Sequence, residues 1–312
     1  MPMIPRRRAG THPVCWRARY SGPVPEAPSG GLTLYYESEG DPAGVPLLLV
    51  VGLGAQLTWW PAGFRSALAD RGFFVICYDN RDAGKSSWLD DAGPVDLLAV
   101  LEGSAPPPYL LSDLAADGVA VLDALGLSSA HVLGVSMGGM IAQGLAIGHP
   151  DRVRSLTSLM STTGDPAVGQ QRPDITEMLL SPRPPDKAAS VEQGVALARA
   201  ISSPVFGFDE HGTRARMALE YDRGNHPDGA GRQIAAILMS GDRTADLGRL
   251  GMPVQVIHGD ADPMIDVSGG RATAAAIPGA RLWVVPGMGH DIPPELFGEI
   301  ADAIAVLAKQ AE

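Results

Sequence analysis

A serine in a tight, glycine-flanked turn is the first residue of this chain that could do chemistry. The segment 134–139, GVSMGG, follows the short apolar run 131–135 and opens a run of small and apolar residues that extends to Ile147. A strand-to-helix turn of this G-x-S-x-G pattern holds its serine in a strained conformation, and the helix N-terminus offers N–H groups to a developing oxyanion. The pattern predicts a nucleophile at Ser136. A purely structural turn is the alternative, because a chain with 38 glycines matches the pattern easily by chance.

A serine hydroxyl is a weak nucleophile until a base removes its proton, and His290 is the histidine best placed to do so. It follows a short apolar run at 282–285 and the loop 286–289, PGMG. Such a loop lies at the carboxyl end of a strand, where open parallel sheets carry their sites. We interpret the remaining histidines as packing or surface residues. They are His12, His131, His149, His211, His226 and His258.

Two carboxylates compete to orient this histidine. Asp260 and Asp262 both follow the apolar run 254–258. Asp262 lies further into the loop and is followed by Pro263, so we predict that it fixes the imidazole tautomer and stabilises the imidazolium. Asp260 is predicted to cap the turn through local backbone N–H groups.

Two backbone amides are predicted to form an oxyanion hole. One is that of Met137, directly after the serine, and the other is that of Leu53 in the glycine-rich loop after the apolar run 46–51. Gly52 or Gly54 could serve instead of Leu53. Trp59 and Trp60 follow this loop and are candidates for the wall of a substrate pocket, although packing of the first helix on the sheet explains them equally well.

The elements that position these residues alternate between strands and helices. Continuous apolar runs at 46–51 and 73–78 are typical of strands buried on both faces of a parallel sheet. A helical pattern extends over 111–125, with Ser112 as a candidate N-cap, and another closes the chain at 294–308. This alternation predicts an α/β fold, a mostly parallel sheet with helices on both faces.

The chain divides into three predicted parts. Residues 1–30 are rich in proline, lack periodicity and are predicted to be a disordered extension. Residues 31–162 and 247–312 form the α/β core. Between them, residues 163–246 lack strand-like runs and are predicted to form a helical cap over the sheet.

Charge and composition exclude several classes of partner. The net charge of −11 over 312 residues argues against binding a polyanion such as nucleic acid. No apolar run approaches the roughly 18 residues that a membrane span requires. Cys77 lies in an apolar run and is predicted to be a buried thiol, whereas Cys15 lies in the N-terminal extension, so no disulfide is expected between them. We expect a cytoplasmic protein; its oligomeric state is left open.

Taken together, the ordered motifs resemble those of the α/β-hydrolase superfamily over nearly all of residues 31–310. Besides the serine turn and the acid and base loops, the segment 79–86, DNRDAGKS, resembles the D-x-R-G-x-G-x-S turn of that family, with Asp82 where glycine is usual. The resemblance implies an eight-stranded sheet with a helical cap insertion. The chain order Ser136, Asp262, His290 is that of the superfamily. A closer similarity is to small-molecule esterases such as the anthracycline methylesterases, which implies a carboxylic ester substrate with an apolar portion.

The activity predicted from these residues is hydrolysis of carboxylic esters of small, largely apolar molecules through an acyl-enzyme on Ser136. It requires no metal ion or cofactor. The same triad could instead serve carbon–carbon bond hydrolysis, lactone or amide hydrolysis, or cofactor-free perhydrolysis. A non-catalytic ligand receptor on the same fold is a further alternative, because fold does not fix function.

Overall fold

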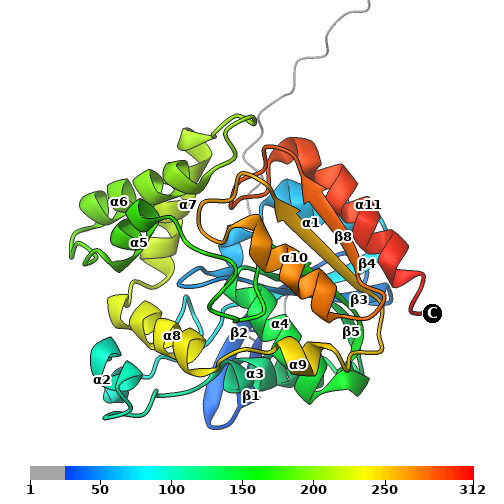
Figure 1. Cartoon of the computed structure of the whole chain (residues 1–312), viewed down its shortest axis with the longest axis horizontal. Helices are drawn as coiled ribbons and strands as arrows, with labels where there is room; N and C mark the ends of the chain where they lie inside the picture. The colour runs from blue at the N-terminus through cyan, green and yellow to red at the C-terminus, as the bar shows by residue number, and fades with distance from the viewer. Residues whose placement is uncertain (1–24) are drawn as a thin grey trace, which may run out of the picture.

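The computed structural model describes residues 25–312, and this part of the chain contains one sheet of eight strands (Figure 1). The strand order is β1-β2-β4-β3-β5-β6-β7-β8; β1 and β2 run antiparallel to their neighbours and the other six strands are parallel. The strands are β1 (Glu26–Ser29), β2 (Leu32–Glu39), β3 (Val45–Val50), β4 (Phe73–Tyr78), β5 (Ala130–Val135), β6 (Val153–Leu159), β7 (Val254–Gly259) and β8 (Arg281–Val285). The prediction of a mostly parallel, eight-stranded sheet is confirmed.

Helices cover both faces of this sheet, and further helices lie beyond one end of it. They are α1 (Ala62–Ala69), α2 (Leu97–Leu101), α3 (Leu111–Ala124), α4 (Met137–Gly148), α5 (Pro173–Leu180), α6 (Lys187–Ile201), α7 (Glu210–Arg223), α8 (Pro227–Met239), α9 (Thr244–Leu247), α10 (Val267–Ala276) and α11 (Phe297–Ala308). Helices α1 and α11 pack together on one face, while α3, α4 and α10 contribute to the core on the other.

The continuous apolar runs have the origin that the sequence indicated. In β3, Leu48 and Val50 point into the core beneath α3 and α4, and Leu47 and Leu49 point into the core beneath α1 and α11. Successive side chains of a strand alternate between its faces, so a strand covered on both sides needs apolar residues at every position.

The inserted helices α5 to α8 follow β6 and form a layer beyond one end of the sheet (Figure 1). Helix α8 packs against the short helix α2, which comes from the segment between β4 and α3 and which the sequence patterns did not reveal. Helix α9 packs instead on α4 and α10, and Leu247 is buried in the main core. The segment that joins α8 to β7 therefore already belongs to the core in its packing.

Two local predictions need correction. Residues 26–29, assigned to the extension, form strand β1, because Ala27 pairs with Leu34 and is fully buried. The rest of that prediction, residues 1–24, lies outside the described residues, as does Cys15. Ser112 lies within α3 and is not its N-cap; the Asp113 carboxylate accepts a hydrogen bond from the Leu110 amide at 2.7 Å at the start of this helix.

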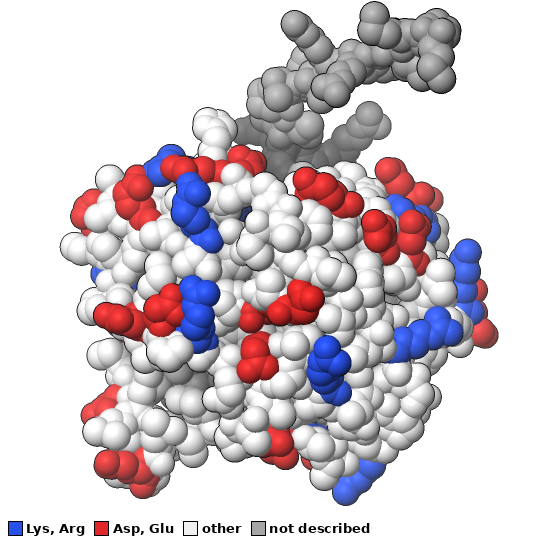
Figure 2. Space-filling view, turned by 45° about the horizontal axis from the view of Figure 1, so that its top comes forward, with Lys and Arg blue, Asp and Glu red and all other residues white. Residues whose placement is uncertain are grey.

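The remaining cysteine and the surface agree with the sequence patterns. Cys77 is a free, buried thiol in β4, and burial raises its pKa to about 12, which leaves it unreactive. On the face in Figure 2, acidic and basic side chains are interspersed and separated by uncharged surface. Within residues 25–312, every helix is too short or too polar to cross a bilayer.

Candidate active site

Ser136 occupies a strained turn between β5 and α4. Its backbone has φ 56° and ψ −123°, a region that costs a non-glycine residue about 1–3 kcal/mol and that persists only where the surroundings enforce it. The Ser136 amide donates to the Leu159 carbonyl oxygen at 3.0 Å, and the Ser161 hydroxyl donates to the Ser136 carbonyl oxygen at 2.8 Å. The side chain thus projects at the carboxyl end of the sheet from a fixed position.

Close packing explains the glycines on either side of Ser136. A Cβ atom on Gly138 would lie 2.1 Å from the Val50 carbonyl oxygen, and one on Gly134 would lie 2.1 Å from the Gly138 carbonyl oxygen. No side chain fits at either position without displacing backbone. A Cβ atom on Gly52 would lie 3.7 Å from the Ser136 Oγ, so the loop after β3 passes directly beside the hydroxyl.

His290 and Asp262 lie together on the loops after β8 and β7. The His290 Nδ1 is 2.7 Å from the Asp262 Oδ2, while the other carboxylate oxygen accepts from the amides of Met264 and Ile265 at 2.8 and 3.0 Å. Burial opposes ionisation of Asp262, but His290 and His258 outweigh it and hold the pKa of this carboxyl below its usual value. The carboxylate is therefore ionised at neutral pH and fixes a proton on His290 Nδ1, which leaves Nε2 free to accept one.

Asp260, on the loop after β7, and His258, near the end of β7 itself, support this pair. The Asp260 Oδ1 accepts from the Gly287 amide at 2.6 Å, so Asp260 joins the loop after β7 to the loop after β8. It does not cap its own turn, contrary to what the sequence suggested. His258 is buried, and its Nε2 lies 2.8 Å from the Ile265 carbonyl oxygen. A carbonyl only accepts, so this nitrogen carries the proton and helps to fix the loop around Asp262.

Ser136, Met137 and His290 line one cavity of about 1010 Å³, together with Leu53 of the loop after β3. Within the described chain, no group accepts a hydrogen bond from the amide of Leu53 or of Met137. The Gly54 amide, in contrast, already donates to the Gln233 Oε1 at 2.8 Å. Gly54 is thereby excluded as an alternative oxyanion donor.

Trp59 and Trp60 lie in different surroundings. Trp59 lines the cavity, whereas Trp60 is only 1% exposed and packs on Phe64, with ring centroids 6.0 Å apart, in the core beneath α1 and α11. The candidate role of Trp60 in the pocket wall is therefore wrong, because its ring is buried in this core, where it meets the Trp59 ring edge-on with centroids 5.1 Å apart. Four apolar side chains of the inserted helices lie at the same cavity, whereas the neighbouring Met239 does not. The four are Met178, Leu179, Leu180 and Leu238.

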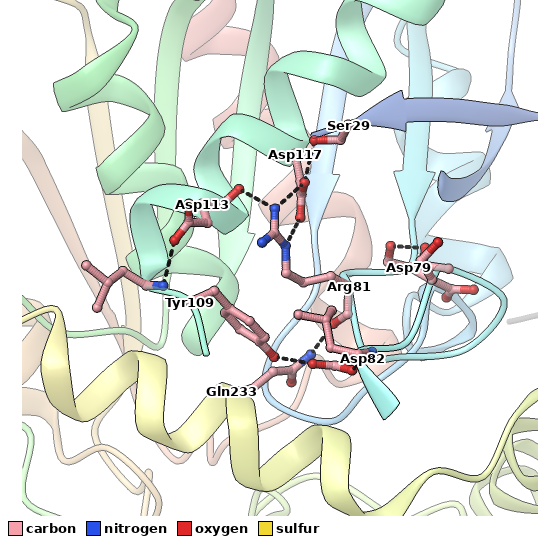
Figure 3. A network of polar contacts seen from close by, with 12 residues as sticks. Ser29, Asp79, Arg81, Asp82, Tyr109, Asp113, Asp117 and Gln233 are labelled. Atoms are coloured by element: carbon pink, nitrogen blue, oxygen red, sulfur yellow. Dashed lines mark hydrogen bonds and ion pairs between the residues drawn. The ribbon is translucent and has the colours of Figure 1, made fainter. Parts of the chain in front are cut away.

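The loop after β4 carries a buried polar network, which Figure 3 shows from close by. Asp82 has φ 64°, a conformation that glycine or aspartate tolerates best, and its side chain forms a fully buried, two-pronged ion pair with Arg232 of α8. Tyr109 donates a further hydrogen bond to Asp82 at 2.7 Å. The aspartate at a usual glycine position is thus the partner of an arginine in the inserted helix α8.

Gln233, the next residue of α8, joins two loops of the site. Its Oε1 accepts from the Gly54 amide, and its Nε2 donates to the Arg81 carbonyl oxygen at 2.9 Å; Figure 3 draws this second contact. The side chain is fully buried. The sequence patterns did not single out Arg232 or Gln233. The only sequence feature that pointed to them was the unusual Asp82, because a buried carboxylate needs a cationic partner. The sequence does not indicate which residue supplies it.

The inserted helix α6 reaches the loop after β8, which carries His290. The His290 amide donates to the Ile201 carbonyl oxygen at 2.7 Å, at the end of α6. Just beyond, Ser203 hydrogen-bonds the Asp291 carboxylate and accepts from the Gly289 amide at 2.8 Å. The inserted helices are therefore joined both to the loop that carries Leu53 and to the loop that carries His290.

A parallel sheet with a strained serine at one strand end and a paired histidine and aspartate at two others defines a class of hydrolase. The model of the alpha/beta hydrolase fold family matches residues 45–200, and the chain belongs to this family.

Known relatives and solved structures agree with this membership. The chain is 32% identical over 300 residues to a rhodomycin D methylesterase of Streptomyces peucetius, covering 90% of this chain and 96% of that protein. It is 31% identical over 303 residues to the rhodomycin D methylesterase of Streptomyces sp. strain C5, with the same coverage. The crystal structure of a hydrolase from Pseudomonas aeruginosa aligns with a TM-score of 0.64 and 26% identity over 91% of this chain and 96% of that one.

Proposed function

We propose that this protein hydrolyses carboxylic esters of small, largely apolar molecules through an acyl-enzyme on Ser136. The observation that carries the proposal is the 2.7 Å contact between His290 and Asp262 at the rim of a cavity that Ser136 also lines. The relatives named methylesterases support an ester as the substrate, and a methyl group as the alcohol portion.

In the proposed reaction, His290 takes the proton of the Ser136 hydroxyl while the oxygen attacks the ester carbonyl carbon. The amides of Leu53 and Met137 donate to the oxyanion, a contribution of about 10²–10³-fold per donor. The alcohol leaves with the proton from His290. Water, deprotonated by the same imidazole, then attacks the acyl-enzyme and releases the carboxylic acid.

The cavity supports a bulky apolar substrate. Its volume of about 1010 Å³ is at the upper end of the range for small-molecule sites, and methionine and leucine side chains of the cap form much of its wall. We infer that residues 163–246 act as the cap that selects the substrate, and that Trp59 of the core completes the cavity wall.

The proposal is tested with a panel that pairs methyl and p-nitrophenyl esters of aromatic acids with lactones, anilides and carbon–carbon bond substrates of similar shape. We expect repeated turnover of the esters, because methanol and nitrophenol leave readily once protonated or ionised. Turnover confined to another bond type would replace ester hydrolysis with that reaction. A single stoichiometric acylation without turnover would favour the receptor alternative.

The hydrogen bond between Gln233 and Gly54 leads to a prediction about the loop after β3, which carries Leu53 and is called the oxyanion loop below. Gln233→Leu is expected to lower kcat for a neutral methyl ester by about tenfold with little change in KM, since the loop loses its anchor at Gly54 but keeps the Leu53 amide. The measurement is steady-state kinetics alongside thermal unfolding.

Ser240→Ala on the same helix is the matched control, because it removes hydrogen bonds with Leu111 and Ala236 without touching the oxyanion loop. It should reduce stability and keep kcat. Equal kcat losses in both variants would mean that Gln233 acts only through stability.

A further inference from the structure

The linker between α5 and α6 places one arginine at the oxyanion loop. Arg183 lines the same cavity as Ser136, and its Nη2 is 2.9 Å from the position that a Cβ atom on Gly54 would take. The guanidinium therefore reaches from the cap across to the residue that follows Leu53.

The backbone around Arg183 is held in place. The segment 182–185 reads Pro-Arg-Pro-Pro, so three of its four residues have φ fixed by a proline ring. The Pro182 carbonyl oxygen accepts from Gln193 Nε2 at 3.1 Å, and the Pro185 carbonyl oxygen accepts from the Tyr221 hydroxyl at 2.8 Å. A rigid, anchored linker leaves the backbone at Arg183 with little conformational entropy to lose on binding.

Arg183 is the one Asp, Glu, Lys or Arg side chain at the cavity that has no hydrogen bond or ion pair within residues 25–312. The other charged side chains at the cavity all have such partners; they are Asp82, Asp165, Arg216, Glu220, Asp242 and Arg243. Glu220, whose charge acts on Arg183 through space, already accepts from Thr58 and Arg216.

The surroundings of this guanidinium favour an anionic ligand. Arg183 is solvent-accessible, yet enclosing protein lowers its pKa because burial disfavours the charged form, an effect that Glu220 partly opposes. An arginine stays protonated at neutral pH in any case. An arginine without a protein partner at the wall of a cavity is open to an incoming anion, and the neighbouring protein screens such a pair less than bulk water on all sides does.

We propose that Arg183 binds a carboxylate on the substrate, so that the preferred esters are half-esters or other esters carrying a second, ionised carboxyl group. The planar fork of a guanidinium matches the two oxygens of a carboxylate. The position beside Gly54 places this group on the side of the cavity next to the reacting carbonyl. This inference rests on the proposed ester hydrolysis and refines its substrate class.

The test compares monomethyl esters of straight-chain dicarboxylic acids, from succinate to sebacate, with their neutral isosteres in which the free carboxyl is a primary amide. We expect one chain length at which the wild-type kcat/KM for the carboxylate exceeds that for the amide by about 10- to 100-fold. Arg183→Gln should abolish this preference by raising KM for the carboxylate far more than KM for the amide, and Arg183→Lys should restore part of it. Arg249→Gln is the control, because Arg249 is exposed and pairs with Asp246 outside the cavity.

Each outcome bears on one of the two proposals. Equal kcat/KM for carboxylate and amide at every chain length, or equal losses on both in Arg183→Gln, would overturn the role of Arg183 while leaving ester hydrolysis intact. Failure of the wild type to turn over any ester of the series or of the neutral panel would instead refute the proposed function.

Discussion

Ser136→Ala is expected to lower kcat for p-nitrophenyl and methyl esters by about 10⁴- to 10⁶-fold, because no other group at the turn between β5 and α4 can form the acyl-enzyme. The remaining activity would come from the two oxyanion amides and from binding alone. Folding should be unaffected. Within the described chain the Ser136 hydroxyl has no hydrogen-bond partner, and alanine fits the same backbone position as serine.

The measurement combines kinetics, thermal unfolding and covalent labelling. A fluorophosphonate probe should modify the wild type at Ser136 and leave the alanine variant unlabelled. Ser112→Ala, at an exposed position of α3, serves as the matched serine control and should keep full activity and labelling. Retained turnover in Ser136→Ala, or labelling of the wild type at another residue, would falsify the assignment of the nucleophile.

Asp262→Asn carries the second-largest expected effect, a fall in kcat of about 10³- to 10⁴-fold. Asparagine can still accept from the Met264 and Ile265 amides through its oxygen, which directs its NH₂ group at His290 Nδ1. That nitrogen must then accept, so the proton moves to Nε2 and the imidazole can no longer take one from Ser136. The fold keeps its hydrogen bonds while the base is held in the wrong tautomer.

Asp260→Asn is the matched control on the same loop. Its oxygen can still accept from the Gly287 amide, and it makes no contact with His290, so we expect kcat to fall by less than about tenfold. Steady-state kinetics of both variants measure the two losses in kcat, and unfolding curves compare their stability. A larger loss of activity in Asp260→Asn than in Asp262→Asn would reverse the assignment of the acid.

Local sequence determined the parts of the protein that depend on short-range rules. The strands β3, β4 and β5 are apolar at nearly every position because both faces of the sheet are covered. The turn at Ser136 needs glycines because neighbouring backbone approaches within contact distance. The carboxyl ends of parallel strands meet at one edge, so chain order alone predicted that the loops of Ser136, Asp262 and His290 would converge.

Only the tertiary structure decided how those loops are connected to one another and to the cap. Asp260 and Asp262 are two residues apart and chemically identical, and their loop directs one at Gly287 and the other at His290. Trp59 and Trp60 are neighbours, yet one lines the cavity and the other packs in the core. Single-residue differences in direction such as these depend on backbone rotation, which no periodicity in the sequence records.

The contacts of the cap join residues that are separated by long stretches of chain. Gln233 meets Gly54, and Arg232 meets Asp82, across 179 and 150 residues respectively. Arg183 reaches the same glycine-rich loop from a proline-rich linker that reads as featureless in the sequence. Their roles arise from the packing of α8 and the α5–α6 linker over the carboxyl edge of the sheet, because burial turns ordinary polar residues into specific partners only once the surrounding chain has excluded water.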